Sequence, residues 1–103
     1  MKKAKILIHN QPAGILSQQD DGSFVFRYND DYIDTPIALT IPVRDEPYLF
    51  KTFPPFFDGL LPEGPQLEGL LKQRKIDKND YFSQLIAVGG DLVGAVTVET
   101  FDE

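Results

Sequence analysis

The segment that most constrains this chain runs from Phe56 to Gly64 and has the sequence FFDGLLPEG. It joins an aromatic pair and two leucines, which favour burial, to a Pro-Glu-Gly sequence, which favours a change of chain direction. None of its residues is a nucleophile, metal ligand or general base of the usual kind. The segment therefore indicates a packed corner or a shaped surface, and it directs the search for function toward a partner protein.

The composition is that of one globular domain. The chain has 103 residues, of which 42% are hydrophobic, and its eight Phe and four Tyr can fill a small core. A chain of this length forms a single core, so we expect one domain over residues 1–103. No apolar run approaches the roughly 18 residues that span a bilayer, and the apolar stretch after Met1–Lys3 is too short for a signal peptide. Without cysteine there are no disulfides or thiolate metal sites, and we expect a cytoplasmic protein.

The charge balance argues against a nucleic-acid partner. The formal net charge is −6, whereas nucleic-acid binders concentrate Lys and Arg on one surface to meet the phosphate backbone. The basic cluster at Lys72–Lys75 falls at the end of a predicted helix, where it complements the negative end of the helix dipole. We therefore expect no direct contact with nucleic acid and no membrane association.

Alternating apolar residues predict a small antiparallel sheet of about five strands. The clearest strand covers residues 24–28, where aromatic side chains share one face. It follows Asp20–Gly22, whose Asp-Gly pair favours a tight hairpin turn, and a second turn is predicted at Gln11–Gly14. The remaining strands are predicted at residues 4–9, 15–18, 37–43 and 92–98, with 37–43 short or at an edge because it carries prolines.

Two helices are predicted before the last strand, after one helical turn at residues 56–61 that Pro62 ends. The first covers about residues 64–74 and has leucines at helical spacing. Asp77 is expected to be the N-cap of the second, which ends at Gly89–Gly90. This order predicts an α+β domain whose sheet is either open or a partly closed barrel. The expected core consists of Phe24, Phe26, Leu39, Ile41, Phe57, Leu70, Leu71, Phe82, Leu85 and Val96.

The residues that could support catalysis do not form a recognisable set. His9 is the only histidine in the chain, and nothing like a nucleophile elbow surrounds Ser17, Ser23 or Ser83. A single histidine near the end of a strand usually has a structural role or faces solvent. We therefore expect no catalytic residue.

Metal and phosphate sites are also not expected. The acidic pairs at residues 20–21 and 30–31 lack the Gly and Glu spacing of a calcium-binding loop. Residues 89–94 (GGDLVG) lack the Lys-Ser/Thr pair of a phosphate-binding loop and precede a strand instead of a helix. In that segment the first two glycines are expected to end a helix, and Gly94 is expected to allow close approach of another backbone or ring. We expect no metal and no cofactor.

Four segments, taken in order, carry a family resemblance: residues 24–28 (FVFRY), 37–43 (IALTIPV), 56–64 (FFDGLLPEG) and 89–96 (GGDLVGAV). Together they resemble the N-terminal subdomain of HipA-type serine/threonine kinase toxins, over about residues 5–99, and the third segment is the most specific. In those toxins the subdomain continues into a kinase body. This sequence has no catalytic-loop Asp and Asn and no phosphate-binding Lys, so the resemblance implies the fold without kinase activity.

A free-standing domain of this kind is similar to the HipS-type antitoxins of HipBST toxin–antitoxin systems. In those systems the kinase, HipT, lacks this subdomain, HipB binds DNA, and HipS neutralises the kinase. The resemblance therefore implies a non-enzymatic antitoxin that binds a HipT-like kinase and meets a HipB-like protein only through the ternary complex. Relatives often carry a bulky residue such as Trp directly after Leu-Leu-Pro-Glu-Gly, where this chain has Pro65.

Two other functions stay open on the sequence alone. The chain could be a structural subunit that completes a split kinase without inhibiting it, or an excised N-terminal piece of a HipA toxin. The acidic ending at Val98–Glu103 is like a natural terminus and argues weakly against the excised piece. The kinase-binding surface is expected at the Pro-Glu-Gly turn, although Glu63 could instead cap the following helix. The expected interface residues are Asp58, Pro62, Glu63, Gly64, Pro65 and Gln66.

Overall fold

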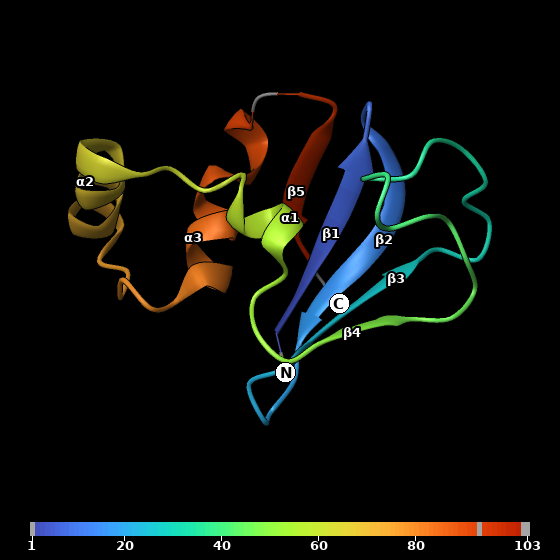
Figure 1. Cartoon of the computed structure of the whole chain (residues 1–103). Coiled ribbons are helices and arrows are strands. Elements are labelled where there is room, and N and C mark those ends of the chain that lie inside the picture. The colour runs from blue at the N-terminus through green and yellow to red at the C-terminus, as the bar shows by residue number, and fades with distance from the viewer. Residues whose placement is uncertain (1, 93, 102–103) are drawn as a thin grey trace.

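The computed structural model describes residues 2–92 and 94–101. Their five strands form one open antiparallel sheet in the order β4-β3-β2-β1-β5, with the helices inserted before the last strand (Figure 1). This arrangement confirms the predicted α+β class. The elements are β1 (Lys2–Ile8), β2 (Gln11–Gln18), β3 (Phe24–Tyr28), β4 (Tyr48–Phe50), α1 (Pro55–Asp58), α2 (Gly64–Arg74), α3 (Tyr81–Val88), the 3-10 turn η1 (Gly89–Asp91) and β5 (Val96–Thr100).

The first hairpin turns earlier than the sequence predicts. His9 and Asn10 have φ angles of 50° and 65°, the positive values that a two-residue hairpin turn requires. The predicted turn at Gln11–Gly14 is wrong, because these residues begin β2. Pro12 is tolerated there because it lies opposite Leu7, where a bulge shifts the register of the β1–β2 pair.

The predicted strand at residues 37–43 is also wrong. Its one β-bridge joins Ala38 to Ile41 within the segment itself. The side-chain hydroxyl of Tyr28 accepts a hydrogen bond from the Ile37 N–H and donates one to the Ile41 carbonyl, so these groups are satisfied without a neighbouring strand. The short strand β4 takes the sheet edge instead and pairs with β3.

The helices follow the sequence more closely. Helix α2 spans the predicted residues, but α1 stops at Asp58, and the N-cap of α3 is Asp80 and not Asp77. The Asp80 carboxylate accepts from the Ser83 N–H at 3.1 Å, whereas the Asp77 carboxylate closes a local turn onto Asn79. Strand β5 starts later than the strand predicted at residues 92–98. Val93 of that prediction lies outside the described residues, and so do Asp102 and Glu103 of the acidic ending.

The core lies on one face of the sheet, under α1 and α3. Seven of the expected core residues are buried there, but Leu39 is 97% exposed. Leu70 and Leu71 are only half-buried, and α2 has no buried residue at all, because this helix stands away from the sheet (Figure 1). The buried members of the expected core are Phe24, Phe26, Ile41, Phe57, Phe82, Leu85 and Val96.

Gly94 does not have the role expected of it. A β-carbon built there would meet no atom within 4 Å, so no other backbone or ring approaches it closely. Its φ of 109° lies in the left-handed region, which explains why glycine occupies this position. The close approach is found at Gly89 instead.

Candidate protein-interaction site

The FFDGLLPEG segment is fixed to the core by its second phenylalanine. Phe57 is fully buried, with ring centroids 6.0 Å from Phe26 and 5.2 Å from Phe56. Leu60 and Leu61 are partly buried against the same core. The segment is therefore a packed corner whose apolar side chains hold it in place.

The polar half of the corner forms an exposed turn. Leu61 N–H still bonds to the Asp58 carbonyl at 3.1 Å, and the chain then extends at Glu63 (φ −131°) and enters the left-handed region at Gly64 (φ 60°). Proline, whose ring fixes φ, follows in the first turn of α2. We name residues 62–66 the corner turn.

The structure settles one alternative for Glu63. This residue occupies the N-cap position of α2, but its side chain accepts no capping hydrogen bond. The Glu63 side chain is exposed, as are Asp58, Gly64, Pro65 and Gln66. Glu63 therefore does not close the helix terminus through a side-chain hydrogen bond.

A groove of about 380 Å³ runs beside the corner turn. One side is formed by the corner and the start of α2, and the other by the end of α3, η1 and the residue after it. The groove thus brings together two segments that are far apart in the sequence, residues 56–64 and 89–96. Its lining residues are Gly59, Leu60, Leu61, Pro62, Gln66, Val88, Asp91 and Leu92.

Two of the six expected interface residues, Pro62 and Gln66, line this groove, and the other four do not. The far side, with Val88, Asp91 and Leu92, was not identified from the sequence as part of a site. A signal was present, since the Gly-Gly-Asp-Leu sequence belongs to one of the four segments that carry the family resemblance.

The charges around the corner turn are acidic. Asp58 and Glu63 are exposed next to the groove, and the exposed Asp91 lies on its opposite side. No Lys, Arg or His is among the residues that line the groove. This arrangement suits binding of a positively charged surface.

The residues considered for catalysis are dispersed. His9 is exposed in the first hairpin turn, Ser17 lies in β2, and Ser23 bonds to Asp21 at 2.6 Å. Within residues 2–92 and 94–101, no three His, Asp or Glu side chains are grouped so that they could hold a metal ion. In the same described part, no helix is both long and apolar enough to cross a membrane.

Ser83 has a structural role at the start of α3. Its hydroxyl donates to Asp80 at 2.7 Å, and Lys2 of β1 lies 3.7 Å from the same carboxylate. Partial burial raises the pKa of Asp80, but the hydrogen bonds from Ser83 and the charge of Lys2 outweigh it, so the pKa lies below its ordinary value. Asp80 therefore links strand β1 to the N-terminus of α3.

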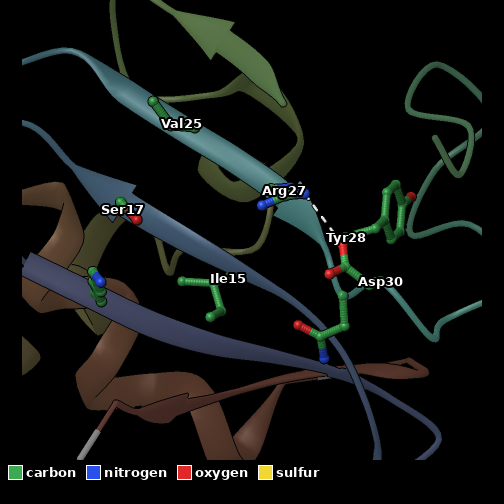
Figure 2. A pocket seen from close by; sticks show the side chains of 8 residues that line it. Ile15, Ser17, Val25, Arg27, Tyr28 and Asp30 are labelled. Atoms are coloured by element: carbon green, nitrogen blue, oxygen red, sulfur yellow. Dashed lines mark hydrogen bonds and ion pairs between the residues drawn. The ribbon is translucent and has the colours of Figure 1, made fainter. Parts of the chain in front are cut away.

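A second hollow, of about 330 Å³, lies on the sheet face opposite the core. Figure 2 shows Ile15, Ser17 and Val25 along its floor, and Arg27 at one side bonded to Asp30 at 3.2 Å. Arg27 is already paired with a carboxylate, and no histidine lies beside Ser17 in the lining of this hollow.

The fold and the exposed corner turn define an α+β domain with a candidate protein-binding surface. Residues 4–99 match the HipA N-terminal domain family, and the chain belongs to that family. A solved structure described as the N-terminal domain of HipA toxin superposes with a TM-score of 0.78 and 28% identity, over 100% of this chain and 95% of that one.

The relatives differ in length. An uncharacterized protein of Haemophilus influenzae is 30% identical over 96% of this chain and 92% of its own length. Two Sinorhizobium fredii proteins that are named as candidate kinases, Y4dM and Y4mE, are 32% and 30% identical. This chain spans only 27% and 22% of their lengths, so the domain belongs both to short chains and to much longer ones.

Proposed function

We propose that this protein is an antitoxin that binds and neutralises a HipT-like serine/threonine kinase, and that it acts without catalytic activity of its own. The observation that carries the proposal is the corner turn, an exposed acidic turn on a buried aromatic base, in a domain of the HipA family. The resemblance to HipS-type antitoxins adds the kinase as partner and makes a HipB-like DNA-binding protein the third member of the complex.

The corner turn is the part of the domain that we place at or beside the kinase active site. Two prolines restrict its backbone, so little conformational entropy is lost on binding. The carboxylates of Asp58 and Glu63 would face Lys, Arg or Mg²⁺ of a nucleotide site and would make association sensitive to salt. Since Pro65 stands where relatives carry a bulky side chain, the shape of the turn and its charges would replace a bulky plug.

The experiment measures kinase binding and neutralisation with a double variant, Glu63→Lys with Gln66→Lys. Both side chains are exposed, so the variant should melt close to the wild type. We expect its affinity for the co-expressed kinase to fall at least tenfold and its protection of cells from the kinase to fall in parallel.

A matched control variant makes the same change in formal charge at two other positions, both in α2. Glu68→Lys with Gln73→Lys changes two exposed α2 residues of the same types, and either pair moves the formal charge from −6 to −3, because Glu→Lys adds two charges and Gln→Lys adds one. Equal losses in both double variants would indicate a net-charge effect and contradict a specific role for the corner turn.

The second candidate is a structural subunit that completes a split kinase without inhibiting it. The relatives Y4dM and Y4mE favour it, because there the matching segment is part of a much longer chain. The two functions separate in a phosphorylation assay with purified proteins. Neutralisation requires kinase activity to fall as this protein is added, whereas a structural subunit raises the activity or leaves it unchanged.

A further inference from the structure

Leu39 is a large apolar side chain that the fold leaves in solvent. It is 97% exposed, and it lies at the tip of a β-turn that the Ile41 N–H closes onto the Ala38 carbonyl at 3.0 Å. The residues on both sides of the turn, Ile37 and Ile41, are buried at 7% and 5% exposure. The turn therefore projects Leu39 outward while its two ends are held in the core.

The support under this turn is rigid. The Tyr28 hydroxyl bonds to the backbone on both sides of it, accepting from the Ile37 N–H at 2.9 Å and donating to the Ile41 carbonyl. Tyr28 is only 3% exposed, its ring meets Phe26 edge-on with centroids 4.9 Å apart, and it stacks on Tyr32. Leu39 thus stands on a support that would lose little entropy on binding.

The loop that carries Leu39 is unusually long for a compact domain. It runs from Asn29 to Pro47 between β3 and β4 without a helix or named strand of its own (Figure 1), and loops of this length usually have a function. Ile33, in the same loop, is 91% exposed. Neither side chain contributes to the core, so the stability of the fold does not explain them.

We propose that Leu39 is a docking anchor that inserts into an apolar socket on the kinase, at a contact separate from the corner turn. The kinase is the occupant because Y4dM and Y4mE join the matching domain to a much longer chain, and a body of that size can cover surface that is open here. The inference rests on the proposed function. It would give the complex a second contact, an aliphatic side chain that fills a pocket of the partner.

The charges of the loop indicate which residue types would surround that socket on the kinase. Asp31 and Asp34 are exposed near Leu39 in the sequence. The other end of the loop carries exposed Asp45 and Glu46, together with Arg44, whose side chain bonds to the Glu46 and Pro47 carbonyls. An apolar anchor within acidic surroundings fits an apolar socket with Lys or Arg at its rim. The buried side chains Ile41 and Phe57 belong to one core cluster, so the Leu39 turn and the corner turn cover the same face of the sheet and can meet one partner.

The test measures the affinity of the full chain for the co-expressed kinase by titration calorimetry, with Leu39→Ser compared with Leu49→Ser. Leu49 is the control because it is also exposed, at 75%, but lies in β4 between two core-facing residues and therefore points to the other sheet face. We expect Leu39→Ser to bind at least tenfold more weakly, with an unchanged melting temperature, and Leu49→Ser to bind like the wild type.

The outcomes distinguish this inference from the proposed function. If Leu39→Ser binds like the wild type while the Glu63/Gln66 variant is weakened, the Leu39 anchor is wrong and the proposed function stands. If Leu39→Ser instead dissociates a homodimer, the occupant is a second copy of this chain and the inference is also wrong. If the wild type does not bind the kinase at all, the proposed function fails, and the anchor fails with it.

Discussion

Gly89 and Val98 are in direct backbone contact, where the end of α3 meets the last strand. A β-carbon built on Gly89 would lie 2.2 Å from the Val98 carbonyl oxygen and 2.9 Å from the Val98 carbonyl carbon. No rotamer change relieves such a clash, because the opposing atoms belong to the backbone of β5. Gly89 therefore sets how closely α3 packs on the sheet, in addition to ending the helix as the sequence predicted.

Replacing Gly89 by alanine should destabilise the domain by about 1–3 kcal/mol, the usual cost of overpacking. A cost in that range lowers the melting temperature by several degrees in a domain of this size. The measurement is thermal unfolding followed by circular dichroism. Gly90→Ala is the matched control, since a β-carbon there meets nothing within 4 Å, and it should change stability by less than about 0.5 kcal/mol.

Phe82→Ala should cost about 3–5 kcal/mol, because Phe82 is 4% exposed and its removal leaves a cavity in the core. Leu71→Ala should cost less, since Leu71 is half-buried on a helix without buried residues. Urea unfolding of both variants measures the difference. Equal free energies of unfolding for Phe82→Ala and the wild type would contradict the core assignment.

The sequence predicts the elements that local chemistry determines. Helix α2 was predicted at about residues 64–74 because its leucines recur at helical spacing and basic residues fall at its end. Residues 37–43 show why pattern alone fails, since Ile37, Leu39 and Ile41 alternate as a strand does. In the structure the same residues form a turn, with Ile37 and Ile41 buried at its ends and Leu39 exposed at its tip. The Tyr28 hydroxyl, which is distant in the sequence, bonds to both ends of that turn, and the local pattern does not reveal this contact.

The candidate site was predictable in part for the same reason. The corner turn could be identified because proline and glycine act locally on the backbone at residues 62–65. The groove beside it could not be located, because its far side comes from η1 and depends on how α3 packs against β5. The position of α3 depends in turn on the contact between Gly89 and Val98, which is not visible in the local sequence.

Asp80 should make the free energy of unfolding depend on pH in the acidic range. Its pKa in the folded state lies below the ordinary value of 3.8, so the stability it contributes is present above that value and is lost as the pH falls through the lower folded pKa. Asp80→Ala should cost about 0.5–2 kcal/mol at neutral pH through the lost helix cap. Asp80→Asn keeps an oxygen acceptor for Ser83 but does not titrate, so its unfolding free energy should fall less steeply below pH 4.

Tyr28 should make stability depend on alkaline pH with the opposite sign. Burial raises the pKa of Tyr28 above the ordinary value of 10.0, although the Ile37 N–H acts against this rise. The stability contributed by the neutral hydroxyl is therefore complete below about pH 10 and is lost as the pH rises through the higher folded pKa. Tyr28→Phe should be less stable at neutral pH by about 1–3 kcal/mol, because the Ile37 and Ile41 backbone groups lose a partner.

The alkaline experiment needs a second tyrosine for comparison. Burial also raises the pKa of Tyr32, with the charge of Asp34 acting in the same direction, so Tyr28→Phe should remove only part of the alkaline slope. Urea midpoints measured between pH 8 and roughly pH 11 would show this. A Tyr28→Phe slope identical to that of the wild type would mean that Tyr28 does not titrate with folding.

A substitution at Gly64 tests the shape of the corner turn without changing its charge. Its φ of 60° is left-handed, yet a β-carbon there would meet no atom within 4 Å. Gly64→Ala should therefore cost about 1–2 kcal/mol through backbone strain alone, or should relax by changing the turn. Gly69→Ala is the matched control, because it makes the same change in α2 with open space and without a positive φ, and it should stabilise the helix by up to about 1 kcal/mol.

If the turn must keep its shape to bind the kinase, Gly64→Ala should weaken binding by up to roughly tenfold and Gly69→Ala should not. Unchanged kinase affinity for Gly64→Ala, together with a lowered melting temperature, would show that the turn acts only as a corner of the fold.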